Sequence, residues 1–221
     1  MAVSAASDSP TSNSQPPTSS PLVLGIDPGL RICGWGVVSG GARPAFVGCG
    51  VIRPRTSDTI GKRLLCLYEA ICALIDEYRP HEVAIEEQYV GALAPTSALA
   101  IGHARAAAVL AAAANGLEVE FYAPAAVKAA VSGYGQGDKR QVQSMVKMLL
   151  SLDVTPEPAD AADALAVALC HIGNRRVRAL ASDSKLGGRR GLRANGQTSK
   201  RAKALISSAS SLRSPTSKLQ Q

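Results

Sequence analysis

Four acidic residues lie in apolar surroundings, and their types and spacing suit chemistry that needs a metal ion. They are Asp27, Glu86, Asp160 and Asp163. The first two directly follow short apolar runs that are typical of buried strands. The other two stand three residues apart in the alanine-rich segment 159–167, a spacing that puts both carboxylates on one face of a helix.

Clustered carboxylates on a half-buried surface predict a divalent cation, because like charges there are costly unless a cation neutralises them. Oxygen ligands favour Mg²⁺, with Mn²⁺ as a substitute. A pair of such ions supports in-line phosphodiester hydrolysis: one activates the attacking water and the other stabilises the leaving 3′ oxygen. Each acid alone could instead be a turn residue, a helix cap or a partner of the helix dipole, so the hypothesis depends on all four.

The elements that must position these acids follow from the apolar pattern. Continuous or alternating apolar runs bounded by turn residues predict strands at 22–26, 34–38, 45–52, 83–85 and 119–122. Apolar residues at helical spacing predict helices at 58–78, 97–115, 124–131, 138–150 and 160–173.

The order of these elements predicts an α/β fold with a five-stranded mixed sheet flanked by helices. The first three strands are joined by short turns and should be antiparallel, with Gly40-Gly41 in the second turn. The last two are reached across helices and should be parallel. Ligands in such sheets bind at the carboxyl ends of strands, where Asp27 and Glu86 stand.

Several motifs together resemble the RuvC Holliday junction resolvases. The resemblance runs in order from about residue 22 to 173 and covers the whole predicted domain. The matching segments are Gly25-Ile26-Asp27-Pro28-Gly29, Ala84-Ile85-Glu86-Glu87, residues 97–105 and the Asp-Ala-Ala-Asp-Ala-Leu-Ala run from Asp160. It implies an RNase H-like fold, a homodimer, and Mg²⁺-dependent paired nicking of four-way DNA junctions that leaves 5′-phosphate and 3′-hydroxyl ends, with the RuvA and RuvB branch-migration proteins as partners.

The resemblance also implies roles for single residues. The family's catalytic carboxylates correspond to the four acids already named, which would hold two Mg²⁺ ions. Lys128 and Lys139 match basic positions beside the site and would bind phosphates, although both could be surface lysines on amphipathic helices. Tyr89 matches an aromatic used at the junction crossover, or it packs its own loop. The following loop, 90–96, lacks the lysine or asparagine expected there and is one residue longer.

Two other residues are interpreted as structural. His171 lies on the same side of its helix as the acidic pair, and a lone helical histidine is more often a core residue than a ligand. Trp35 and its neighbouring glycines fit strand packing and a tight turn.

Three other classes of protein remain to be weighed. A YqgF-type RNA-processing nuclease begins with a similar strand, but the acidic pair of the last helix and residues 97–105 favour the resolvase. Residues 25–29 also resemble the phosphate-loop start of actin-like ATPases and sugar kinases, but those proteins need a second glycine-rich phosphate loop and about twice the folded length, which this chain lacks. A non-enzymatic DNA-binding protein that uses a basic tail leaves the four carboxylates unexplained.

The charge distribution separates the chain into a body and two tails. Residues 1–21 are rich in Ser, Thr and Pro and predict disorder, as do residues 175–221, so 22–174 is the predicted nuclease domain. Residues 175–221 hold 12 Lys and Arg against one acid, whereas residues 1–174 have a net charge of −4. The basic tail is either a solvated extension or a segment that binds polyanions.

The remaining features concern location and assembly. Five cysteines without a CxxC pair argue against disulfide or zinc frameworks and favour the reducing cytoplasm. The sequence has no secretory signal and no uncharged apolar run of about 18 residues or more, so no membrane association is expected. The alanine-rich helix 97–115 is the predicted homodimer interface, because small side chains permit close helix approach; otherwise it is a core helix.

Overall fold

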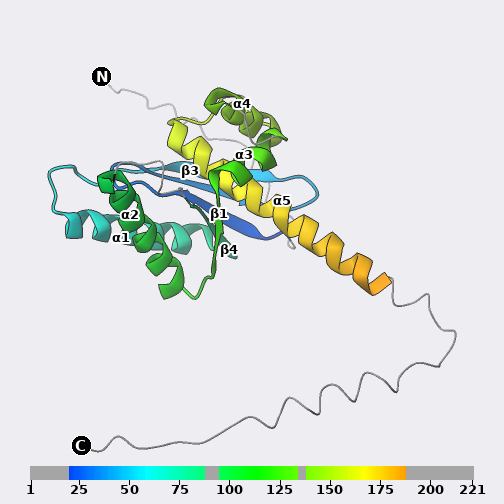
Figure 1. Cartoon of the computed structure of the whole chain (residues 1–221), viewed down its shortest axis with the longest axis horizontal. Helices are drawn as coiled ribbons and strands as arrows, with labels where there is room; N and C mark the ends of the chain where they lie inside the picture. Colours follow the sequence, from blue (N-terminus) through cyan, green and yellow to red (C-terminus); the bar gives the residue numbers. More distant parts are fainter. Residues whose placement is uncertain (1–19, 88–94, 134–137, 188–221) are drawn as a thin grey trace, which may run out of the picture. The chain divides into compact units, whose positions relative to one another are not determined.

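The computed structural model describes residues 20–87, 95–133 and 138–187, and its strands form one five-stranded sheet (Figure 1). The strands are β1 (Leu22–Asp27), β2 (Cys33–Ser39), β3 (Ala45–Ile52), β4 (Glu82–Glu86) and β5 (Val119–Tyr122). Their order in the sheet is β3-β2-β1-β4-β5. The pairs among β1, β2 and β3 are antiparallel, whereas β4 runs parallel to both β1 and β5. The predicted mixed sheet is therefore confirmed.

Five helices of the described chain cover the two faces of this sheet. They are α1 (Ile60–Tyr78), α2 (Pro95–Ala114), α3 (Pro124–Ser132), α4 (Lys139–Leu149) and α5 (Ala159–Gly187). One hydrophobic cluster joins α1 and α2 to one face of the sheet, and a second joins α3, α4 and α5 to the opposite face (Figure 1). The predicted helices are all present.

The predicted end of the last helix at Gly173 is wrong, because α5 continues to Gly187, into the segment assigned to the basic tail. A single glycine costs a helix only about 1 kcal/mol, and the Arg, Ala and Leu residues that follow are good helix formers. Two arginines of this extension also pair with the sheet: Arg175 with Glu82, and Arg178 with Glu120. The compact unit extends to Arg178.

The period-two alternation of the central strands puts two of the acids on one face. In β1, Leu24 and Ile26 belong to the cluster under α1 and α2, whereas Val23 belongs to the cluster under α5. Asp27 is two positions beyond Gly25 and four beyond Val23, so it faces α5. Ala84 of β4 also packs on the α5 side, which places Glu86 there too.

Glycines allow α5 to lie unusually close to the sheet. A Cβ added to Gly34 would lie 2.0 Å from the carbonyl oxygen of Asp160, and one added to Gly25 would lie 2.2 Å from that of Ala164. Real Cβ atoms do not approach this closely, so only glycine fits at either strand position. The backbone of α5 is thereby brought against β1 and β2, and its first turn lies beside the end of β1.

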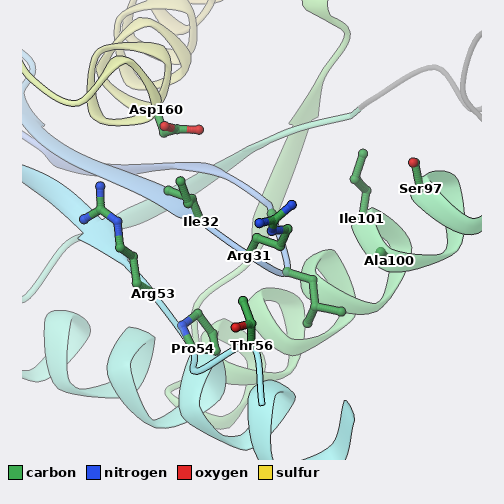
Figure 2. A pocket seen from close by; sticks show the side chains of 11 residues that line it. Arg31, Ile32, Arg53, Pro54, Thr56, Ser97, Ala100, Ile101 and Asp160 are labelled. Carbon is green, nitrogen blue, oxygen red and sulfur yellow. The ribbon is translucent and has the colours of Figure 1, made fainter. Parts of the chain in front are cut away.

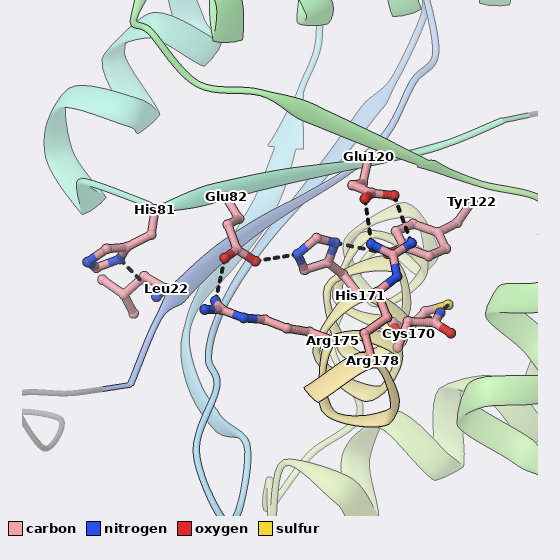
Figure 3. A network of polar contacts seen from close by, with 10 residues as sticks. Leu22, His81, Glu82, Glu120, Tyr122, Cys170, His171, Arg175 and Arg178 are labelled. Atoms are coloured by element: carbon pink, nitrogen blue, oxygen red, sulfur yellow. Dashed lines mark hydrogen bonds and ion pairs between the residues drawn. The ribbon is translucent and has the colours of Figure 1, made fainter. Parts of the chain in front are cut away.

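A polar network attaches the middle of α5 to β4 and β5 (Figure 3). His171, only 6% exposed, hydrogen-bonds through Nδ1 to the Tyr122 hydroxyl at 3.0 Å and through Nε2 to Glu82. Arg178 adds a two-pronged contact to Glu120, with nitrogen–oxygen distances of 2.6 and 3.3 Å. The structural interpretation of His171 is consistent with these contacts, which fix the helix whose first turns bear Asp160 and Asp163.

One face of α2 is buried and the other is exposed. Its buried residues are Ala104, Ala107, Ala108, Ala111 and Ala112. By length and composition α2 is the described helix that could cross a membrane, but these alanines pack against the core beside α1. Leu99 and Leu110 lie on the exposed side.

Candidate active site

One cavity of about 350 Å³ brings the four predicted acids together. We call it the carboxylate cavity. Its lining includes Asp27 from the end of β1, Glu86 from the end of β4, and the acidic pair from the start of α5. Lys128 of α3 and Lys139 of α4 complete its polar lining. Of the residues that the sequence singled out for the site, Tyr89 and most of loop 90–96 lie outside the described residues.

The environment of the carboxylate cavity raises the pKa of Asp27 strongly. Burial is the main reason why its pKa is raised from 3.8 to about 8, and the negative charge of Glu86, then of Asp163, raises it further. A hydrogen bond between the Asp27 and Glu86 side chains acts in the same direction. Ionising Asp27 at neutral pH is therefore costly, and a nearby cation would lower that cost.

Lys139, one of the two lysines that line this cavity, forms an ion pair with one of the acids. The Nζ atom of Lys139 lies 2.8 Å from Oδ2 of Asp163, and this contact raises the pKa of Lys139. Lys139 is the first residue of α4, and the preceding Asp138 caps the helix by accepting a hydrogen bond from the Gln141 amide at 2.7 Å. The cap therefore places Lys139 over the acidic pair.

The donor set fits a hard divalent cation. Carboxylate oxygens, the preferred ligands of Mg²⁺ and Mn²⁺, face the cavity from three elements. In the described ranges no three His, Cys, Asp or Glu side chains already form a closed ligand cluster. Carboxylates that repel one another do not converge on a point by themselves, so binding of a cation would draw them together.

A second cavity, of about 720 Å³, shares a lining residue with the first, and Figure 2 shows the side chains that line it. We call it the arginine cavity. Asp160 lines both cavities, and the arginine cavity adds Arg31 from the loop after β1 and Arg53 from the end of β3. Thr56 lines it from the loop before α1, and Ser97 from the first turn of α2.

Neither arginine was among the residues predicted for the site, although the sequence contains one signal for them. Arg31 precedes the predicted second strand and Arg53 follows the predicted third strand. Because these two strands pair antiparallel, the start of one lies beside the end of the other, and the two arginines come to the same edge of the sheet. The observed pairing of Cys33 with Ile52 shows this arrangement.

The mixed sheet in the order β3-β2-β1-β4-β5, with acids at the ends of its central strands and on a helix packed across them, defines a nuclease of RNase H-like fold. Residues 23–171 match the family model described as crossover junction endodeoxyribonuclease RuvC. This range includes all four acids.

Curated and solved relatives agree with that match. Crossover junction endodeoxyribonuclease RuvC of Natranaerobius thermophilus is 43% identical over 71% of this chain and 98% of its own length. The protein of the same name from Caulobacter sp. is 50% identical over 70% of this chain and 94% of its own. The structure of Thermus thermophilus RuvC in complex with a Holliday junction substrate matches with a TM-score of 0.67 and 33% identity, covering 71% of this chain and 96% of that one.

The chain therefore belongs to the RuvC family of crossover junction endodeoxyribonucleases. It is a Holliday junction resolvase, and its reaction is the hydrolysis of phosphodiester bonds.

Proposed function

We propose that the carboxylate cavity is where this resolvase cuts DNA, with two Mg²⁺ ions, or Mn²⁺ in their place, held by its four acids. Two strands of a four-way junction are nicked as a pair, one in each subunit of a homodimer, leaving 5′-phosphate and 3′-hydroxyl ends. The observation that supports this best is the single cavity that joins acids from β1, β4 and α5. The roles of the four acids, Lys128 and Lys139 are part of this proposal.

The residues of the cavity divide the work by position. Asp27 and Glu86 end two neighbouring parallel strands, so the sheet holds their carboxylates rigidly toward α5. Asp163, now paired with Lys139, would be a ligand of the cation, and the Lys139 ammonium would then be available for a phosphate oxygen. Lys128 lines the same cavity from α3 and is suited to a second phosphate contact. When bound, the metal ions would activate the attacking water and stabilise the leaving 3′ oxygen.

The proposed dimer is supported by the exposed face of α2. Leu99 and Leu110 are 61% and 62% exposed and lie three turns apart on the same side, with small Ala106 between them. A junction offers two equivalent strands, and a two-fold symmetric dimer gives each strand its own cavity. We further infer that the protein acts in the cytoplasm, as its cysteine pattern favours. The branch-migration proteins RuvA and RuvB are the partners that the family resemblance implies.

The proposal is tested by offering the protein a four-way junction, a plain duplex and an RNA–DNA hybrid side by side, with Mg²⁺ and with a chelator. We expect paired nicks in the junction alone, and only with Mg²⁺. Cleavage of the hybrid in preference to the junction, or cleavage in the chelator, contradicts the proposal.

A further inference from the structure

We propose that the arginine cavity binds the sugar-phosphate backbone of the strand being cut, with Arg31 and Arg53 contacting phosphates next to the scissile one. The inference rests on the proposed function, because it takes the scissile phosphate to lie in the carboxylate cavity. It adds a binding site for the same strand and names the residues that form it.

The two cavities meet at one shared residue. Asp160 lines both cavities, so a strand whose scissile phosphate lies among the acids runs past this residue into the arginine cavity. Figure 2 shows Arg53 and Arg31 extending into the space below Asp160, with Ser97 and Ile101 of α2 on its other side. The cavity has about twice the volume of the carboxylate cavity, at about 720 against about 350 Å³.

The charged side chains that line the arginine cavity are mostly positive. Four acids and two lysines line the carboxylate cavity, whereas two arginines and one acid line the arginine cavity. In the described part of the chain, neither Arg31 nor Arg53 forms an ion pair or a hydrogen bond with another residue. Two exposed guanidinium groups are thus available, and their planar donor geometry matches phosphate oxygens.

The loop bearing Arg31 is held in place. Nη2 of Arg63 in α1 donates a 2.7 Å hydrogen bond to the carbonyl of Leu30. A Cβ added to Gly29 would lie 2.0 Å from the carbonyl oxygen of Ile32, so this turn is tight and admits only glycine. A contact from a fixed loop loses little conformational entropy on binding.

The remaining residues that line the arginine cavity suit the sugar-phosphate backbone of DNA better than its bases. Thr56 and Ser97 provide hydroxyls, which commonly bind DNA phosphates. Ile32, Ala100 and Ile101 offer an apolar wall for sugars, and none of the residues described around this cavity is aromatic, so it lacks a platform for base stacking.

The test uses the full-length chain and four-way junctions that bear a single uncharged methylphosphonate, placed in turn at each position around the scissile phosphate. Binding is measured without metal across a salt series for wild type, Arg31→Ala, Arg53→Ala and the double variant. Arg55→Ala is the matched control, because it removes an exposed arginine two residues from Arg53 that does not line the cavity. Lysine replacements at both sites keep the charge but lose the planar donor group.

We expect each alanine variant to bind about tenfold more weakly, and the double variant to have a salt slope shallower by about 2. At one or two positions flanking the scissile phosphate, methylphosphonate should weaken binding by wild type but not by the double variant. The lysine variants should recover the salt slope, and Arg55→Ala should resemble wild type.

Equal methylphosphonate effects in wild type and the double variant overturn the inference, as does an equal loss in Arg55→Ala. Failure of wild type to cut any junction with Mg²⁺ instead overturns the proposed function. The two failures are distinguishable. If the wild type cuts normally but its methylphosphonate effects persist in the double variant, only the inference about the arginine cavity is wrong.

Discussion

At the scale of single residues, the arrangement that suits the proposed active site for metal binding also lowers the stability of the metal-free fold. Asp27 is half-buried and lies near three other acids, and desolvation together with their negative charge raises its pKa to about 8. The folded chain therefore keeps a proton on Asp27 that the unfolded chain has already lost above its ordinary pKa of 3.8. The contribution of Asp27 to the free energy of unfolding of the metal-free protein accordingly falls as the pH rises from 3.8 to about 8.

Asp27→Asn should therefore stabilise the protein in the absence of divalent metal. The amide has nearly the same shape and cannot ionise, so the loss of stability between pH 5 and pH 8 should shrink. At pH 8 in a chelator the melting temperature should rise by about 2–4 °C for each kcal/mol recovered. A variant that melts at or below the wild-type temperature at pH 8 would show that the burial of this charge is not costly.

Lys139 should compete with the metal for Asp163, since the ammonium lies 2.8 Å from that carboxylate. Lys139→Met should lower the Mg²⁺ concentration needed for half-maximal cleavage, while the rate at saturating Mg²⁺ falls about ten- to a hundredfold because a phosphate contact is lost. Arg140→Met is the control, since Arg140 is the next residue of α4 and does not line the cavity. An unchanged Mg²⁺ requirement in Lys139→Met would rule out the competition.

At the scale of elements, α5 is the part that assembles the site. Its first two turns provide the acidic pair, the glycines beneath it set its distance from the sheet, and the hydrogen bonds of His171 fix its middle. The helix can therefore move little without separating Asp160 from Asp27.

Gly34→Ala should displace the start of α5, because the new Cβ would lie 2.0 Å from the carbonyl oxygen of Asp160. We expect a loss of about 1–3 kcal/mol in the free energy of unfolding, together with loss of cleavage. Gly173→Ala, in the same helix, has nothing within 4 Å of its added Cβ and should instead stabilise by about 0.5–1 kcal/mol and keep its activity. Denaturant unfolding and junction cleavage check both variants, and equal effects would remove the assigned role of Gly34.

Strand and helix positions could be predicted from the sequence because each has a clear period. The run Leu22–Ile26 and the acid after it identify β1, and the acidic pair identifies the start of α5. The four acids could be assigned to one site because the sequence around each is too apolar for an ordinary solvent-exposed residue.

Other features depend on packing between distant segments and left a weaker signal. Gly34 was assigned to strand packing, but its need for glycine comes from the Asp160 backbone. The extension of α5 past Gly173 was missed because its partners, Glu82 and Glu120, lie far away in sequence. The arginine cavity likewise exists only once β3, the loop after β1 and the start of α2 meet.

At the scale of the whole molecule, paired cutting requires two copies of the cavity. Leu110→Asp, at an exposed position of α2, should dissociate the proposed dimer and turn paired nicks into single nicks. Met148→Asp, equally exposed but on α4, is the control. Sedimentation equilibrium at micromolar concentration measures the mass, and a supercoiled plasmid with one extruded junction distinguishes single from paired nicks. A Leu110→Asp protein that remains dimeric would exclude this face of α2 as the interface.

The central claim is that DNA is cut among the four carboxylates, and single-turnover cleavage by the amide variants tests it most directly. Asp27→Asn, Glu86→Gln, Asp160→Asn and Asp163→Asn are mixed in excess with a labelled junction, complex formation is verified by gel shift, and Mg²⁺ is then added. We expect each variant to bind at least as tightly as wild type, because repulsion of the DNA falls, and to form no nicks. Mg²⁺-dependent nicking by Asp27→Asn at the wild-type rate would contradict the account.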